Sequence, residues 1–124
     1  RQYKMIAQII TGLVAIEAII IMMIEMFGSV AQQAKSFELE PAVLKMPEVK
    51  VLLANQGIYN GLFGALILVT MFFIHGPQQV LMLQFEMLYI LIAAIYGSIT
   101  SARKILVVQG LPALVALIAL YFLN

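Results

Sequence analysis

The chain has 124 residues, of which 64% are hydrophobic and 10% are charged, and its mean hydropathy is +1.05. A soluble globular domain is about 45–50% apolar and about 25% charged, so this composition excludes a water-soluble domain and a disordered tail. The net charge of +1 excludes the basic footprint of a nucleic-acid-binding protein, and the predicted environment of the chain is a lipid bilayer.

Four segments are long and apolar enough to cross a bilayer as helices, which requires about 20 mostly apolar residues. In chain order, they cover about residues 5–27, 49–74, 79–102 and 105–123. The first is too long for the apolar region of a signal peptide and lacks an A-x-A-like cleavage site, so we interpret it as a retained span. The predicted fold is all-α, an integral membrane four-helix bundle that forms one domain over residues 1–124.

The connections between the segments predict their arrangement and orientation. Two connections are tight, so consecutive helices are expected to be antiparallel neighbours, whereas the loop of residues 28–48 is long and is expected to lie partly in the membrane interface. Arg1 and Lys4 lie at the N-terminal side. Five basic residues lie at the opposite side: Lys35, Lys45, Lys50, Arg103 and Lys104. Because basic residues are enriched on the cytoplasmic side, this asymmetry favours termini outside and the long loop in the cytoplasm.

Small residues recur at helical spacing in three of the spans, and close packing of small residues associates helices in lipid. The predicted packing stripes are Gly57, Gly61 and Ala65 in the second span, Ala93, Gly97 and Ser101 in the third, and Ala113, Ala116 and Ala119 in the fourth. Pro112 is expected to bend the fourth helix and to free a backbone carbonyl near Val108.

Most polar side chains of the spans fall at the midplane or in the leaflet next to the 28–48 loop. At a rise of 1.5 Å per residue, Glu17 lies roughly 15 Å from that side and Gln109 roughly 6–8 Å from it. Polar groups in hydrocarbon normally face the bundle or a cavity, so the sequence predicts a polar pocket with Glu17 at its floor. The candidate ligand-binding residues are Glu17, Glu25, Asn55, Gln56, Tyr59, Asn60, Tyr96 and Gln109.

The three acidic residues within the spans have different expected roles. Glu17 has no basic partner there, so its carboxyl group tends to be neutral; we expect it to donate to Asn60 or Gln56, or to alternate between a proton and a cationic substrate. Glu25 lies nearer the interface, where it can meet Lys50, Lys104 or water, and an ion pair with one of the lysines is favoured. Glu86, toward the opposite face, is expected to point at packed protein or a partner subunit and has no assigned role.

The sequence contains no pattern that indicates a metal, a cofactor or a catalytic set. His75 is the one histidine, Cys is absent, and neither a zinc motif nor a phosphate-binding or dinucleotide-binding loop is present. We therefore expect no cofactor and favour a protein that is not an enzyme.

Strings in all four spans, AIEAIIIMMIEMF, LANQGIYNGLFGA, IYGSIT and VQGLPALVAL, resemble a family of small bacterial and fungal membrane proteins known as domain of unknown function 1304. The resemblance implies a four-helix integral membrane protein with no established activity. We expect its location to be the cytoplasmic membrane of a bacterium. The family pattern has His after the first Glu, whereas this chain has Ala18, so no Glu–His pair is implied. The residues that the resemblance marks as important are Glu17, Glu25, Asn55, Gln56, Gly57, Tyr59, Asn60, Gly61, Tyr96, Gly97, Gln109, Gly110 and Pro112.

Three functions remain open. The leading hypothesis is a homo-oligomer that binds or transports a small solute or cation, with Glu17 as the proton-linked group. The second is a binding protein or enzyme for a membrane-dissolved lipid, quinone or isoprenoid whose polar end contacts Glu17 and the amides. The third is a structural or assembly protein whose polar side chains form a helix zipper, each pair contributing roughly 0.6 kcal/mol.

Overall fold

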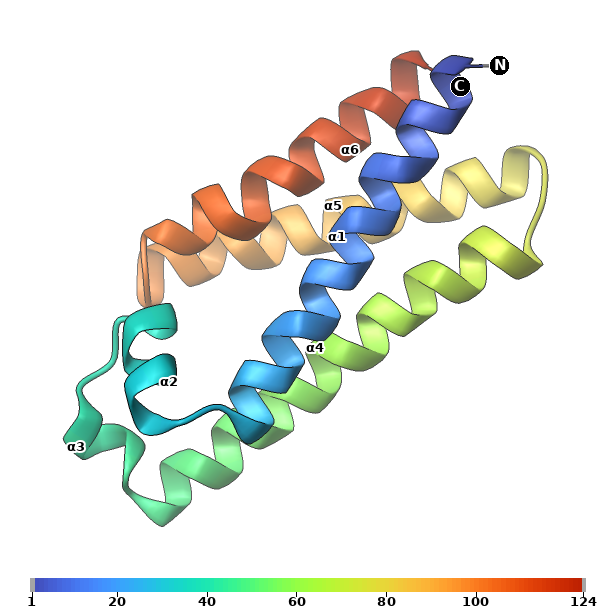
Figure 1. Cartoon of the computed structure of the whole chain (residues 1–124). Coiled ribbons are helices and arrows are strands. Elements are labelled where there is room, and N and C mark those ends of the chain that lie inside the picture. The colour runs from blue at the N-terminus through green and yellow to red at the C-terminus, as the bar shows by residue number, and fades with distance from the viewer. Residues whose placement is uncertain (1, 124) are drawn as a thin grey trace.

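The structure, a computed structural model, describes residues 2–123, which form helices and connections with no strand in that range (Figure 1). In chain order the helices are α1 (Gln2–Phe27), α2 (Val30–Phe37), α3 (Pro41–Leu44), α4 (Pro47–Phe73), α5 (Pro77–Thr100), the π-helix η1 (Leu106–Gly110) and α6 (Leu111–Phe122). The predicted all-α fold is confirmed. Arg1, one of the two basic residues predicted to lie at the N-terminal side, is outside the described residues.

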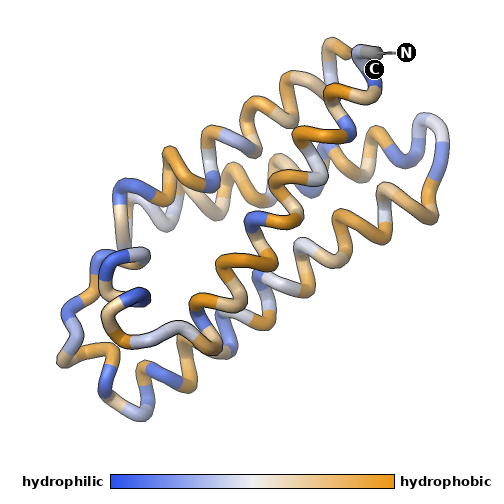
Figure 2. The backbone as a smooth tube through the Cα atoms, in the orientation of Figure 1, coloured by the Kyte–Doolittle hydropathy of each residue, from blue (hydrophilic) through white to orange (hydrophobic). Residues whose placement is uncertain are grey.

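Three helices, α1, α4 and α5, are long and apolar enough to cross a membrane. The fourth predicted span is shorter, because its apolar helix covers Leu106–Phe122 and its first turn is η1. Large apolar side chains such as Phe72, Phe73 and Ile99 are exposed on the long helices. Figure 2 shows hydrophobic residues along these helices, whereas hydrophilic residues gather around α2 and α3 and at the α4–α5 turn. This exterior is compatible with a membrane protein.

Proline begins three of the helices. Pro41, Pro47 and Pro77 are the first residues of α3, α4 and α5, where the missing N–H costs no hydrogen bond and the fixed φ suits the helix. The turn that joins α4 to α5 passes through Gly76, whose φ of 74° is accessible to glycine at little cost. α4 and α5 are therefore joined as an antiparallel hairpin.

The long helices form a wedge rather than a closed ring. α1 packs along α4 and contacts α6, while α5 packs against η1 and α6. α4 and α5 contact each other much less, and they diverge from their turn toward the end of the molecule that carries α2 and α3 (Figure 1). We call that end the α2–α3 end, and the opposite end, with the turn at residues 74–76, the turn end.

The buried core occupies the half of the molecule near the turn end. Its members include Ala7 and Val14 of α1, Ile67 of α4, Leu83 of α5 and Leu120 of α6, all almost fully buried. Side chains from four helices therefore fill the space between them at this end. Toward the α2–α3 end, α4 and α5 lie farther apart (Figure 1).

Glycines of α4 bring this helix close to α1. A Cβ atom at Gly57 would lie 2.8 Å from Met26 Cγ, and one at Gly64 would lie 2.6 Å from the backbone oxygen of Ala15. A Cβ at Gly61 would overlap the side chain of Met22. Three glycines on one face of α4 thus allow a close approach of the two backbones, and a side chain at Gly64 in particular would meet the backbone of α1. Ala65, the predicted third member of this stripe, is half-buried, and Gly64 makes the close contact instead.

The segment before Pro112 is where the fourth apolar stretch departs from a regular α-helix. The backbone N–H of Leu111 donates to the carbonyl of Leu106, a π-type bond, and α6 begins directly afterwards. Proline cannot donate a backbone hydrogen bond, and prolines and π-turns are both recognised causes of bends in helices. Gly110 allows this turn to approach Ala94 of α5, since a Cβ there would lie 3.3 Å from the Ala94 Cβ.

Candidate ligand-binding site

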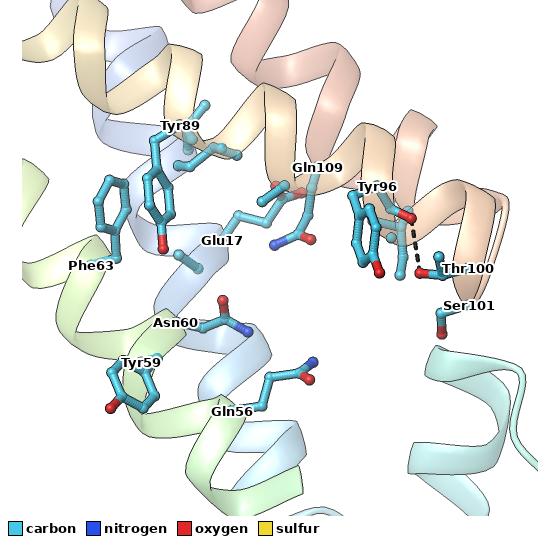
Figure 3. Close-up of a pocket in the computed structure, with 16 residues that line it drawn as sticks. Glu17, Gln56, Tyr59, Asn60, Phe63, Tyr89, Tyr96, Thr100, Ser101 and Gln109 are labelled. Carbon is cyan, nitrogen blue, oxygen red and sulfur yellow. Dashed lines mark hydrogen bonds between the residues drawn. The ribbon is translucent and has the colours of Figure 1, made fainter. Parts of the chain in front are cut away.

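A cavity of about 440 Å³ opens where α4 and α5 diverge. The stacked rings of Phe63 and Tyr89, with centroids 4.3 Å apart, mark where the two helices still touch. Beyond them the walls come from α1, α4, α5 and η1, as Figure 3 shows. We call this space the polar chamber; its polar lining residues are Glu17, Gln56, Tyr59, Asn60, Tyr89, Tyr96, Thr100, Ser101 and Gln109.

A second cavity of about 560 Å³ lies between α1 and η1 and reaches α2. We call it the apolar chamber, because most of its wall is Leu13, Ile16, Ile20, Ile21, Ile24, Phe37, Ile105 and Val108. The two chambers share the residues Glu17, Gln56, Asn60, Ile105 and Gln109. They are therefore adjacent parts of one space that lies in the half of the molecule near the α2–α3 end.

Glu17 lies at the junction of the two chambers. It is half-buried on α1 between the buried residues Val14 and Ala18, and its side chain extends into the cavity (Figure 3). Across residues 3–123, no hydrogen bond joins its carboxyl group to another residue, so the expected bonds to Asn60 and Gln56 are not formed. Both oxygens of this carboxyl group are free to bind a ligand.

Glu25, and not Glu17, accepts hydrogen bonds from the side-chain amides of Gln56 and Asn60. Its side chain is only 2% exposed, and it accepts 2.7 Å hydrogen bonds from Gln56 Nε2 and from Asn60 Nδ2. The predicted ion pair of Glu25 with Lys50 or Lys104 is wrong. The glycine contact between α1 and α4 holds Glu25 against the polar face of α4, while the Lys104 ammonium donates to a backbone oxygen of α2.

The remaining predicted residues divide between the cavity and the surface. Tyr59 and Tyr96 line the polar chamber at its opening between α4 and α5, where they are 77% and 69% exposed. Gln109 reaches the cavity from η1 (Figure 3). Asn55 is exposed on α4 and lines neither chamber, so its inclusion in the site is not supported by its position.

Three small residues predicted to pack helices together instead border the cavity. Ala93, Gly97 and Ser101 line the polar chamber, and their small size leaves room there. The sequence reasoning also missed Tyr89, Thr100 and Ser101 as lining residues. The spacing of Tyr89 and Tyr96, seven residues or about two helical turns, is a signal that places both on one face of α5.

Glu86 lies outside both chambers, in the contact between α4 and α5. It is 6% exposed and accepts a 2.8 Å hydrogen bond from the Thr70 hydroxyl to Oε2. Its other oxygen, Oε1, is buried without a hydrogen-bond partner in the described part of the chain. Within that part, no group of three His, Cys, Asp or Glu residues is placed to hold a metal ion.

The chain belongs to the family described as Protein of unknown function (DUF1304), whose sequence profile matches residues 12–121. All the residues that line the two chambers fall within that range. Among similar proteins is the uncharacterized protein YpaA of Lactococcus lactis subsp. lactis (strain IL1403). It is 36% identical over 115 residues, which cover 92% of this chain and 95% of the relative. No solved structure matches the chain significantly.

Proposed function

We propose that this chain is an integral membrane protein that crosses the bilayer with α1, α4, α5 and the η1–α6 segment. The exposed apolar side chains of all four segments support this arrangement. The Leu106–Phe122 helix is about 25 Å long at 1.5 Å per residue, close to the roughly 30 Å of a hydrocarbon core. In the proposed orientation, the α2–α3 end, which carries most of the basic residues, faces the cytoplasm.

Within this arrangement, the two chambers form a binding site for a small solute or cation. The observation that carries the proposal is the position of Glu17, whose carboxyl group lies between the two chambers without a hydrogen-bond partner among residues 3–123. An ionisable group held in hydrocarbon is costly and is a default candidate for a functional site. A cationic or hydrogen-bond-donating ligand would satisfy this carboxyl group.

The buried core between the chambers and the turn end supports binding from one leaflet rather than a continuous pore. The core residues between the cavity and the turn end are almost fully buried, including Ile67, Leu83 and Ala116. Transport through this chain would therefore require the helices to separate at the turn end, or a second copy of the chain to complete a path.

A structural role is favoured for Glu25, Gln56 and Asn60. Gln56 and Asn60 of α4 each donate a hydrogen bond to Glu25 of α1 across the α1–α4 contact, which is the arrangement expected of a helix zipper. This role leaves Glu17 as the carboxyl group available for a ligand. The two roles separate cleanly in a mutational experiment because they depend on different glutamates.

The test is native mass spectrometry of the protein released from mild detergent before delipidation, together with binding of tetramethylammonium to protein in nanodiscs. We expect a small-molecule adduct or cation binding in the wild type that Glu17→Gln abolishes without changing thermal stability. Glu86→Gln is the matched control, because it makes the same chemical change outside both chambers and should leave binding intact. Equal binding by the wild type and Glu17→Gln would overturn the proposal.

A further inference from the structure

The two chambers differ in the polarity of their walls, and this difference indicates how polar and apolar groups are distributed along the ligand. Nine of the 16 residues that line the polar chamber have side chains that can hydrogen-bond. The wall of the apolar chamber exposes a smaller share of polar surface, and eight of its 15 lining residues are isoleucine, leucine, valine or phenylalanine. The two are joined at Glu17 and Gln109. A ligand that fills both chambers must therefore have one polar end and one apolar end.

The polar chamber has the chemistry of a cation site. Besides the Glu17 carboxyl group, its wall includes the aromatic rings of Phe63, Tyr59, Tyr89 and Tyr96. Figure 3 shows the Tyr89 and Tyr96 rings on opposite sides of the Glu17 and Gln109 side chains. Aromatic faces attract cations through the ring quadrupole, and a quaternary ammonium group is recognised by such rings without hydrogen bonds. A carboxylate together with several rings thus favours a cationic head group.

The apolar chamber is an exit to the side of the molecule. Ile16 and Ile20 of α1 and Val108 of η1 line it, and each is between 45% and 54% exposed, so the gap between the two helices reaches the exterior. At the α2–α3 end the chamber is bounded by Phe37 and Lys104. A hydrocarbon chain attached to a head group at Glu17 would therefore leave sideways, between α1 and η1, into the surrounding lipid.

From these three features we propose that the ligand is a single-chain cationic amphiphile. Its head occupies the polar chamber against Glu17, and its hydrocarbon chain passes between α1 and η1. This inference rests on the proposed function and adds the ligand class to it. The apolar chamber favours such a ligand over a fully hydrophilic cation, because a hydrophilic cation has no hydrocarbon chain to place between α1 and η1.

The test compares dodecyltrimethylammonium with tetramethylammonium, which has the same head group and no chain, in nanodiscs. Two variants narrow the opening of the apolar chamber between α1 and η1, which we call the passage. Val108→Phe narrows it from η1, and Ile20→Phe narrows it from α1 as a second, independent variant. Val107→Phe is the matched control, because Val107 is the exposed neighbour of Val108 and lines neither chamber. Partition of each compound into the lipid is the same for all variants, so differences report the protein site.

We expect both passage variants to bind dodecyltrimethylammonium at least tenfold more weakly than the wild type and Val107→Phe, with unchanged binding of tetramethylammonium. Undiminished binding of the long-chain cation by both folded passage variants would overturn the inference and leave the proposed function standing. Equal loss of both cations in the passage variants would also overturn it, because the passage would then not be a separate chain site. Glu17→Gln is expected to lose both compounds, and its failure to do so would instead overturn the proposed function.

Discussion

Asn60 of α4 donates its amide N–H to Glu25 of α1 across 2.7 Å, one helical turn from the contact between Gly57 and Glu25. The small residue Gly57 makes this possible, because a Cβ atom there would lie 3.1 Å from the Glu25 Cβ. The hydrogen bond and the glycine contact therefore depend on each other. The α1–α4 pair is the most closely packed part of the fold, and it holds the inner wall of the cavity in place.

The first prediction concerns the strength of this bond. Glu25→Ala and Asn60→Ala should each lower the free energy of unfolding, and the double variant should lose less than the sum. Interhelical hydrogen bonds in membranes contribute about 0.6 kcal/mol on average and up to about 1.7 kcal/mol, which sets the expected coupling energy. Steric trapping or reversible unfolding in mild detergent measures it. Asn55→Ala, on the exposed side of α4, should be neutral, and strictly additive losses for Glu25 and Asn60 would contradict the prediction.

The second prediction concerns the glycine contact. Gly64→Ala should destabilise the fold by about 1–3 kcal/mol, because the new methyl group would meet the backbone oxygen of Ala15 and α1 would have to move. Gly12→Ala is the control on the facing helix. A Cβ there meets only the flexible side chain of Met71 at 3.6 Å, and alanine has the higher helix propensity. Thermal unfolding of both variants provides the comparison, and equal stability would show that the helices are less closely packed.

The third prediction concerns the buried carboxyl group of Glu86. Glu86→Leu should leave stability unchanged or raise it, because the substitution removes a buried oxygen that has no hydrogen-bond partner in the described structure. In the variant, the single proton of the Thr70 hydroxyl can be donated to the backbone oxygen of Leu66, which lies 3.0 Å away. Cation binding should also persist, since Glu86 lies outside both chambers. A loss of about 2 kcal/mol or more on thermal unfolding would indicate a favourable interaction at this carboxyl group.

The fourth prediction concerns topology, and it uses the absence of cysteine from the native sequence. Single cysteines at two exposed positions, His75→Cys in the α4–α5 turn and Ala42→Cys in α3, should lie on opposite sides of the membrane. An impermeant maleimide applied to intact cells should label position 75, and it should label position 42 only after permeabilisation. The reversed pattern would keep the crossings and invert the orientation. Labelling of both positions from outside would contradict the proposed crossings.

Some features of the candidate site follow from local sequence alone. The apolar lengths place helices at nearly the observed residues, and prolines at positions 41, 47 and 77 mark where three of them begin. The four-residue spacing of Gln56 and Asn60 puts both on one face of α4, and the position of Glu17 along α1, ten residues before Phe27, follows from the helical rise. These features require only the geometry of a single helix.

The tertiary structure decided which polar groups meet, because partner choice depends on the rotation and crossing of two helices. Gly64 and Ala65 both lie near the packing face of α4, and only the observed crossing brings Gly64 against α1. The same crossing places the amides of Gln56 and Asn60 within hydrogen-bond distance of Glu25. It leaves the Glu17 carboxyl group without a hydrogen bond to any of residues 3–123. Helical periodicity therefore determined the faces of each helix, whereas the close α1–α4 contact and the divergence of α5 from α4 decided where the cavity lies.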